Sequence, residues 1–220
     1  MSARRLGPAL LALVVLLPTV ARGQQPGTRA AHDAGNPMRA LAAAAKRRTT
    51  ERATERYDPI FRKYTKRYFG IGYDWRVFKA QGMAESDLHP DATSRVGARG
   101  IMQLMPSTYK LIASRRTDFG AINDPEWNIA AGIMHDRYLW RLWEKDVTEA
   151  ERRAFMFGAY NAGEGTIKRA RSAARAASLE DYRWQSIERV APDVQPWRYR
   201  ETLGYVKKIE ENYRSFGAAP

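Results

Sequence analysis

Hydrophobic residues recur every three or four positions from about residue 52 onward, and this spacing predicts α-helices. The first helix is predicted to begin at Asp58-Pro59, with Asp58 as the N-cap and Pro59 as the first helical residue, and to stop at Gly70. Its apolar face would consist of Ile60, Phe61, Tyr64 and Tyr68.

A second helix is predicted to start near Asp74, whose carboxylate can cap it. It should end near His89-Pro90, because a proline disfavours helical conformation in the residue before it. A loop with two glycines follows, and the next helix is expected to begin at Pro106 with Ser107 as its cap.

The longest helix is predicted to open at Asp124-Pro125, with an apolar stripe of Ala130, Met134, Tyr138 and Leu142 flanked by Trp127 and Ile133. Two more stripes predict helices. The first comprises Ala150, Ala154, Phe157 and Asn161, and is broken by Gly163. The second comprises Thr202, Tyr205, Ile209, Asn212 and Phe216. No convincing run of alternating residues indicates strands, so the fold class is predicted to be mainly α.

Residues 1–23 have the pattern of a cleavable secretory signal peptide. A positively charged start precedes an almost uncharged apolar run, which is followed by the small residues Ala21 and Gly23 that a signal peptidase requires. The apolar run is shorter than the roughly 20 residues that a spanning helix needs. We therefore expect export, and no integral membrane span in the mature chain.

Residues 24–50 are rich in Ala, Arg, Gly and Thr without periodicity, which predicts a flexible linker before a domain at residues 51–220. The chain contains no cysteine, which excludes a disulfide framework, a thiolate nucleophile and a Cys-ligated zinc site. It also leads us to expect that the protein is not a lipoprotein. The predicted location is periplasmic or associated with the cell wall.

The formal charge is +13, and cleavage after residue 23 would remove three arginines and leave +10. A basic exported protein can bind nucleic acid, anionic lipid or an anionic wall polymer, and a basic surface can equally serve solubility alone. No conspicuous basic amphipathic helix in the mature chain supports a membrane-surface protein.

Most familiar catalytic motifs are absent from the sequence. It has no Gly-x-Ser-x-Gly elbow, no His-Glu-x-x-His pair and no phosphate-binding glycine loop. The three histidines, His32, His89 and His135, lack the context of a Ser-His-Asp site. Any chemistry is therefore expected to come from carboxylates, with no metal and no cofactor.

Glu85 lies at the end of a predicted helix that carries Trp75, Phe78 and Met83. A carboxyl at the mouth of an apolar pocket has a raised pKa, because its charged form is disfavoured there, and it can then donate a proton near neutral pH. Helical spacing alone does not distinguish Glu85 from an ordinary solvated charge. Asp87 would face a different direction and is predicted to be solvated.

Four blocks of residues resemble the motifs of the soluble lytic transglycosylase (SLT) family. The first is Ala84-Glu85-Ser86 through Ser94, followed by Gly97-Ala98-Arg99-Gly100-Ile101-Met102-Gln103-Leu104-Met105-Pro106-Ser107-Thr108. The later blocks, in the family's order, are Asp124-Pro125 with Asn128-Ile129, Gly132 and Tyr138-Leu139; Ala159-Tyr160-Asn161-Ala162-Gly163 with Gly165; and Glu201-Thr202 with Tyr205-Val206. Ile101 replaces the usual leucine, and His89 stands where the family often has asparagine.

The resemblance implies a goose-lysozyme-like domain of packed helices. It also implies a lyase that cleaves the MurNAc–GlcNAc β-1,4 bond of peptidoglycan and leaves a 1,6-anhydro-MurNAc end. Glu85 would protonate the leaving oxygen and then act as the base toward the C6 hydroxyl of the muramic sugar. Because the nucleophile belongs to the substrate, one carboxylate is enough, whereas ordinary retaining or inverting glycosidases need a pair.

Five residues are predicted to bind substrate. Ser94 resembles the family's serine beside the scissile sugar, and Tyr160 and Asn161 resemble residues that contact its N-acetyl group. Gln103 has an amide that can bond a hydroxyl or acetamido group, and Met102 offers an adaptable apolar wall, although core packing is the commoner role of methionine.

Supporting roles are predicted for Ser86, Gly97, Gly100 and Tyr205. The two glycines would let the backbone approach the sugar, and Ser86 is a short donor beside Glu85. Tyr205 resembles the tyrosine whose hydroxyl orients the catalytic carboxyl, and it also fits a core position. Glu201 is expected to pair with an arginine.

Two other functions stay open at this point. A lysozyme-type peptidoglycan hydrolase would need a positioned base for water, for which the sequence offers no candidate. A non-catalytic peptidoglycan-binding module would have no need of a buried acid. The expected partner is the peptidoglycan glycan strand rather than nucleic acid, and cell-wall or secretion machinery is a candidate protein partner.

Overall fold

The computed structural model describes residue 41 and residues 55–116 and 118–217. The predicted signal peptide at residues 1–23 lies outside the described residues, and so does the predicted linker at residues 24–50 except for residue 41. None of the helices described reaches the length and hydropathy that crossing a membrane requires.

The described residues form α-helices joined by loops, which confirms the predicted mainly α fold class. The helices are α2 (Asp58–Phe69), α3 (Arg76–Ser86), α4 (Pro106–Ala113), α5 (Pro125–Leu142), α6 (Glu149–Ala162), α7 (Glu164–Ala176), α8 (Trp184–Val190) and α9 (Tyr199–Ser215), with a 3-10 turn, η1 (Ala191–Asp193). Extended pairing within this part of the chain is limited to two isolated bridges, Thr93 with Arg99 and Arg99 with Leu104.

Local signals set several helix ends where the sequence predicts them. Asp124 caps α5, since its Oδ1 accepts hydrogen bonds from two amides of the first turn, the shorter at 2.8 Å. Trp75 rather than Asp74 takes the N-cap position of α3, but Oδ1 of Asp74 still accepts a hydrogen bond from the amide of Arg76 at 3.0 Å at the start of this helix. Gly70 (φ 99°) and Gly163 (φ 83°) end α2 and α6 in a backbone conformation that favours glycine.

Two predicted caps are wrong. Asp58 is the first residue of α2 rather than its N-cap, and its carboxylate instead pairs with the Lys79 ammonium at 2.6 Å. Ser107 lies inside α4, where Met105 takes the N-cap position in an extended conformation without a side-chain hydrogen bond. Pro106 is the first residue of α4, whereas Pro59 is the second residue of α2.

Helix α3 ends at Ser86, earlier than the proline at position 90 predicts. Asp87 and Leu88 adopt left-handed conformations with φ of 53° and 61°. Their amides donate back to carbonyls of the last turn, at 3.1 Å and 3.3 Å, and this arrangement terminates a helix without proline. Glu85 therefore stands in the final turn of α3.

The buried face of α5 differs from the predicted stripe. Tyr138 is 43% exposed, and Met134 and Leu142 are only partly buried. Helices α2, α4 and α6 all contact α5 and cover most of its circumference, so a four-residue repeat does not identify one inner face. The buried residues are Asn128, Ile129, Ala130, Ala131, Gly132, Ile133, Asp136, Leu139 and Trp140.

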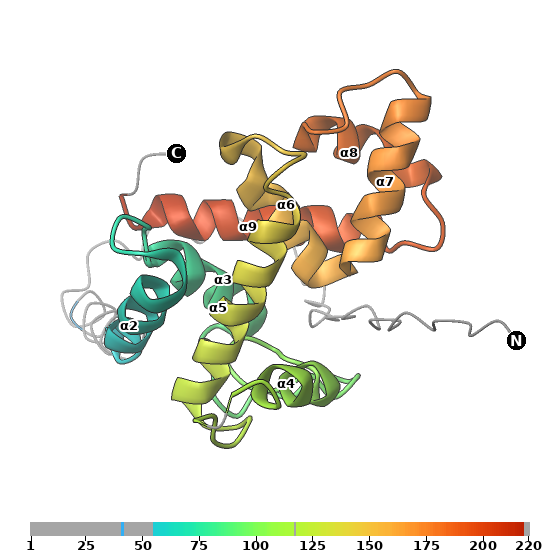
Figure 1. The fold of residues 1–220 in the computed structure, drawn as a ribbon. Helices are drawn as coiled ribbons and strands as arrows, with labels where there is room; N and C mark the ends of the chain where they lie inside the picture. The colour runs from blue at the N-terminus through green and yellow to red at the C-terminus, as the bar shows by residue number, and fades with distance from the viewer. Residues whose placement is uncertain (1–40, 42–54, 117, 218–220) are drawn as a thin grey trace, which may run out of the picture.

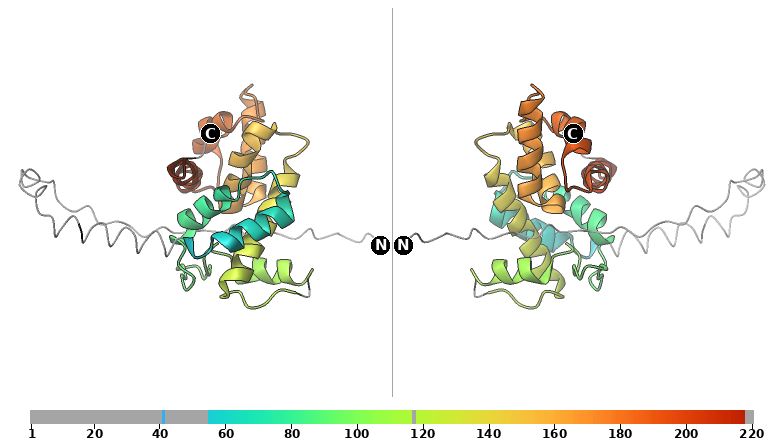
Figure 2. Two further views of the ribbon diagram at one scale, coloured as in Figure 1. Left: turned by 90° about the vertical axis from the view of Figure 1, so that its left-hand side faces the viewer. Right: turned by 90° about the vertical axis from the view of Figure 1, so that its right-hand side faces the viewer.

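Helix α3 packs along α9, and α6 contacts both α5 and α9 (Figure 1). Helix α4 and the α7–α8 pair lie at opposite ends of the group formed by α3, α5, α6 and α9. Figure 2 shows α9 nearly end-on, at one side of the molecule. The packing places the last turn of α3 against α9, although the two helices are far apart in sequence.

Candidate active site

Glu85 is almost fully buried, with 6% of its surface exposed. The hydroxyl of Tyr205, on α9, donates a hydrogen bond to Glu85 Oε1 at 2.6 Å. Glu85 Oε2 has no hydrogen-bond partner among the described residues. One oxygen of the carboxyl is therefore fixed, and the other keeps its bonding capacity for a ligand.

Burial raises the pKa of Glu85 to about 8, because the carboxylate loses its hydration. The hydrogen bond from Tyr205 and the nearby Lys208 ammonium lower this pKa without cancelling the effect of burial. Burial thus keeps the proton on Glu85 at neutral pH, while Tyr205 favours the form that has lost it. The group can act as an acid and then persist as a carboxylate.

Two buried polar residues that the sequence analysis does not single out adjoin this pair. Gln81 donates through Nε2 to the Tyr205 hydroxyl at 3.2 Å and to Asp136 Oδ1 at 3.3 Å. Both Gln81 and Asp136 are 0% exposed. Burial raises the pKa of Asp136 well above its ordinary value, and the charge of Glu85 adds to this rise. Spacing could have found Gln81, which lies one helical turn before Glu85.

The loop between α3 and α4 is held by side chains that the sequence analysis assigns to the site. Gln103 is 3% exposed and donates through Nε2 to two loop carbonyls, at 3.2 Å and 2.9 Å. Ser94 Oγ accepts from the amide of Ala98 at 3.0 Å, and Ser86 Oγ donates to the carbonyl of Ile101 at 2.9 Å. These contacts shape the loop, and substrate contacts of Ser94 and Gln103 stay predictions.

The two loop glycines serve different purposes. Both have positive φ, 86° at Gly97 and 75° at Gly100. A Cβ on Gly100 would lie 2.4 Å from Asn128 Nδ2, so this glycine is required by the side chain packed on it. A Cβ on Gly97 would meet nothing within 4 Å, which leaves the backbone accessible as its predicted role requires.

Asn128, at the start of α5, connects the loop to the helix. Its Oδ1 accepts from the amide of Met102 at 2.8 Å, and its Nδ2 donates to the carbonyls of Arg99 and Ile122 at 3.0 Å and 2.9 Å. The side chain is 0% exposed, and both ends of its amide are used. Asn128 therefore fixes the loop that follows Glu85.

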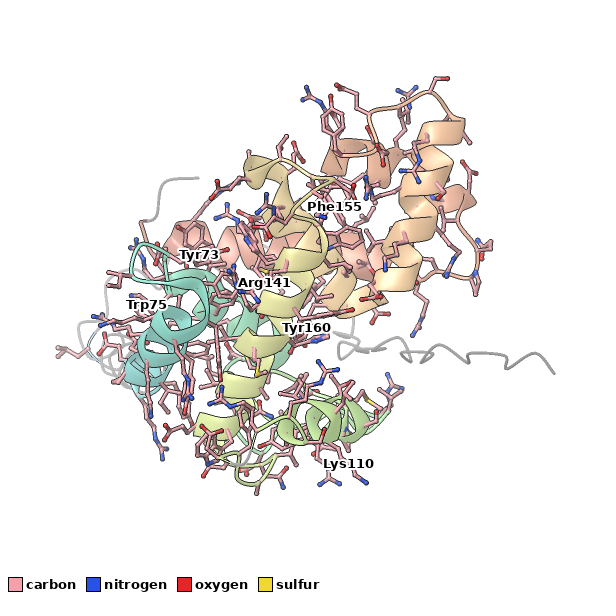
Figure 3. All side chains as sticks on the ribbon, viewed as in Figure 1. Tyr73, Trp75, Lys110, Arg141, Phe155 and Tyr160 are labelled. Carbon is pink, nitrogen blue, oxygen red and sulfur yellow. The ribbon has the colours of Figure 1, made fainter. Side chains whose placement is uncertain are left out.

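Met102, Tyr160 and Asn161 join the loop to α6 and α9. The Met102 side chain is 0% exposed and packs on Gly132, where a Cβ would lie 2.7 Å from its Cγ. The Tyr160 hydroxyl donates to the Met102 carbonyl at 2.8 Å, and Figure 3 shows Tyr160 beside the middle of α5. Asn161 Oδ1 accepts from Thr202 Oγ1 at 2.8 Å. Their contacts with substrate remain predictions.

A hollow lies where the loop, α5 and α6 meet. Tyr160, His135 and Tyr138 line it, with the His135 ring 5.3 Å from the Tyr160 ring and 6.0 Å from the Tyr138 ring, centroid to centroid. Glu164 on its rim accepts a hydrogen bond from the Tyr138 hydroxyl at 2.6 Å. The wall is therefore aromatic with a polar edge.

Two smaller predictions are confirmed. Asp87 is exposed, and Glu201 lies 3.5 Å from the guanidinium of Arg198.

Across residues 55–116 and 118–217, no group of three His, Asp or Glu side chains is arranged to hold a metal ion.

Residues 59–182 match the family model described as the transglycosylase SLT domain, over more than half of the chain. The chain belongs to the transglycosylase SLT family. The matched span includes Glu85, the loop with its glycines, and both Tyr160 and Asn161. It ends before α9, which carries Tyr205.

The SLT chain is similar to the membrane-bound lytic murein transglycosylase F of Stutzerimonas stutzeri, at 30% identity over 156 residues, which are 69% of this chain and 30% of that protein. The protein of the same description from Pseudomonas putida (strain W619) is 31% identical over 153 residues, 68% of this chain and 30% of its own length. The chain thus spans less than a third of the length of these relatives.

Among solved structures, the 70-kDa soluble lytic transglycosylase of Escherichia coli superposes with a TM-score of 0.53 at 29% identity, covering 74% of this chain and 25% of that chain. An inactive variant of the lytic transglycosylase Slt of Pseudomonas aeruginosa gives a TM-score of 0.56 at 23% identity, over 74% of this chain and 24% of that one, and supports the fold alone. The predicted SLT family and lysozyme-like fold are confirmed.

Proposed function

We propose that this chain is a peptidoglycan lytic transglycosylase that cleaves the MurNAc–GlcNAc β-1,4 bond and leaves a 1,6-anhydro-MurNAc end, with Glu85 as its catalytic acid and base. The observation that carries the proposal is the state of Glu85. It is a buried carboxyl with a pKa of about 8, one oxygen bonded to Tyr205, and a second oxygen without a partner in the described part of the chain.

The reaction needs one proton that leaves and returns. Glu85 donates it to the glycosidic oxygen as the bond from that oxygen to C1 breaks, and the enzyme is left with a carboxylate. The hydrogen bond from Tyr205 stabilises this charged form, so it becomes more favourable as the step proceeds. Glu85 then accepts the proton of the C6 hydroxyl while the C6 oxygen bonds to C1. The acid is restored, and no water is consumed.

We assign the substrate contacts to Ser94, Gln103, Tyr160 and Asn161. Met102 is fully buried against Gly132, and we assign it to supporting the loop. The aromatic hollow that Tyr160 lines supports the assignment of Tyr160, since sugar rings present flat apolar faces together with hydroxyls. Ser86, Gly97 and Tyr205 keep their supporting roles, whereas Gly100 supports the loop by making room for the Asn128 side chain.

A hydrolase would need a base that activates water. Asp136 is a second acid near Glu85, but it is 0% exposed, and burial raises its pKa well above its ordinary value because the charged form is disfavoured there. A buried neutral acid neither reaches water nor accepts its proton, which favours the transglycosylase over the hydrolase. A non-catalytic binding module would gain nothing from a buried carboxyl that lowers its stability.

We propose an envelope location, reached by export through residues 1–23, with the glycan strand as partner. The relatives named membrane-bound lytic murein transglycosylase F support an envelope role. A formal charge of +10 after cleavage favours encounter with a wall whose stem peptides carry carboxylates. Cell-wall or secretion machinery is the candidate protein partner, and no cofactor is proposed.

Digestion of purified sacculi with residues 24–220, followed by mass spectrometry of the muropeptides, tests the proposal. We expect 1,6-anhydro ends from this protein and none from its Glu85→Gln variant. Reducing ends would assign the chain to the hydrolases, and binding to sacculi without cleavage would assign it to the binding modules.

A further inference from the structure

Helices α3, α5 and α9 meet at a chain of four buried polar side chains. The chain runs from Glu85 to the Tyr205 hydroxyl at 2.6 Å, from there to Gln81 Nε2 at 3.2 Å, and on to Asp136 Oδ1 at 3.3 Å. Each of the four side chains is at most 6% exposed. The proposed reaction uses Glu85 and Tyr205 but gives no role to the other two.

We propose that Asp136 is a positioning residue for the catalytic acid: by holding the amide of Gln81 in one orientation, it directs the Tyr205 hydroxyl proton onto Glu85. The inference rests on the proposed function, because positioning matters only if Glu85 transfers protons.

The Tyr205 hydroxyl can donate only one hydrogen bond. A tyrosine hydroxyl has one proton, which Tyr205 donates to Glu85 Oε1. Its oxygen accepts a hydrogen bond from Gln81 Nε2, which leaves that proton available for Glu85. If the amide of Gln81 turned its oxygen toward Tyr205 instead, the hydroxyl would donate to Gln81 and the bond to Glu85 would be lost.

Asp136 supplies the contact that opposes this rotation. Its Oδ1 accepts a second hydrogen bond from Gln81 Nε2, so the nitrogen side of the amide is held toward both Asp136 and Tyr205. Burial disfavours the charged form of Asp136 and raises its pKa well above its ordinary value, and the contact with Gln81 needs only an acceptor oxygen rather than a charge.

The cluster is unfavourable for stability. Gln81 Oε1, Glu85 Oε2 and Asp136 Oδ2 are all buried without a hydrogen-bond partner in residues 55–116 and 118–217. Unpaired buried polar atoms destabilise a fold, and an apolar residue at position 136 would avoid the loss. A polar chain that weakens the core and ends on the catalytic carboxyl points to a role in catalysis.

Other titratable groups also face the cluster and must be held constant in any pH experiment. Tyr73, before α3, and Tyr160, on α6, lie near enough to Asp136 for its ionisation to affect their pKa values. Tyr160 also faces Glu85, as do Tyr205 and Lys208 from α9. None of them is altered in the variants below.

The test compares Asp136→Leu and Gln81→Met, which each remove one link, with Asp136→Asn, which keeps the acceptor oxygen. Thr65→Val is the matched control, because Thr65 is a buried polar residue of α2 whose Oγ1 has no partner in the described residues. For each variant, kcat and KM are measured on soluble glycan strands, the pKa of Glu85 is measured by carbon NMR of its carboxyl, and folding by circular dichroism.

We expect Asp136→Leu and Gln81→Met to lower kcat about tenfold with little change in KM, since a misplaced catalytic group slows the chemical step. Both should also raise the pKa of Glu85, because the hydrogen bond that favours its charged form is weakened. Asp136→Asn should restore kcat to within about threefold, and Thr65→Val should match the unaltered protein.

Unchanged kcat and unchanged pKa of Glu85 in Gln81→Met would overturn the proposal, even if Asp136→Leu failed to fold. A fall of the Glu85 pKa in Asp136→Asn would also overturn it, because Asp136 would then be acting by charge. The NMR titration needs no turnover. A failure of the positioning role is therefore distinguishable from an inactive protein, which would contradict the proposed function instead.

Discussion

Asn128 and Gln81 are both fully buried side-chain amides next to the catalytic turn, but their hydrogen bonding differs. The amide of Asn128 bonds three backbone groups and uses its oxygen and its nitrogen. Gln81 bonds only two side chains, both through nitrogen, and its oxygen has no partner in the described part of the chain.

Buried polar side chains therefore serve two different purposes in this protein. Around Asn128, satisfied hydrogen bonds hold a loop in one shape, and the gain is stability. Around Gln81, three unpaired oxygens lower stability while leaving a carboxyl ready to exchange a proton. Variants in the region around Gln81 should therefore behave differently from variants in the region around Asn128.

The largest effect is expected at the acid itself. Glu85→Gln should lower turnover of peptidoglycan at least about 1000-fold, because the amide has a similar shape but no acidic proton to transfer. Release of anhydro-muropeptides measures the effect, and circular dichroism checks that the variant folds. Activity within about tenfold of the unaltered protein would remove Glu85 from the mechanism.

The next effect should appear in stability. Asn128→Ala should lower the free energy of unfolding by about 3 kcal/mol, since the amide of Met102 and two carbonyls lose their partners. Urea denaturation measures the loss. Gln81→Met is the counterpart in the other region and should lower stability by less, because the partners that Asp136 and Tyr205 lose are offset by removal of the unpaired Gln81 Oε1. Equal losses in the two variants would contradict the distinction between the regions.

The pH dependence of stability should reveal the cost of burying the charged form of Glu85. Between pH 4.5 and about 8 the unfolded chain has released this proton while the folded chain retains it. Stability should therefore fall as pH rises, by roughly 1.4 kcal/mol per pH unit from this group. Denaturation at a series of pH values should show Glu85→Gln equal to the unaltered protein near pH 4 and more stable above pH 7. A constant difference across this range would contradict the raised pKa.

A smaller effect is expected at the orienting hydroxyl. Tyr205→Phe should lower kcat about tenfold and raise the pKa of Glu85, because a hydrogen bond to the charged form is lost. The alkaline limb of the pH–rate profile measures the shift. Tyr213→Phe is the control, since it removes a hydroxyl from the same helix that bonds Asp74 and not Glu85. A similar change in both variants would assign the effect to packing of α9.

Much of the fold follows from local sequence signals. The cap at Asp124 and the glycines at positions 70 and 163 end or begin helices through backbone chemistry that neighbouring residues determine. The sequence pattern does not predict α7 or α8. The inner face of α7 is Ile167, Ala170 and Ala174, together with Thr166 and Arg171, so the helical spacing is present in the sequence although only one large apolar residue carries it.

The site residues also fall into those that the sequence could identify and one that it could not. Glu85 and Tyr205 were identified through family resemblance, because nothing in helical spacing joins residues 120 positions apart. Asp136 could not be found by either route. A polar residue on an amphipathic helix is expected to face solvent, and only the packing of three helices around α5 turns this position inward.

The contact between Glu85 and Tyr205 also fixes when this site can come into existence. Ribosomes make a chain from its N-terminus, so α3 and its acid are complete while the 120 residues leading to Tyr205 are still to be added. Until α9 is made and docks, the carboxyl lacks both its hydroxyl partner and part of the wall that buries it. Fragments that stop short of α9 would therefore carry the acid without its hydroxyl partner.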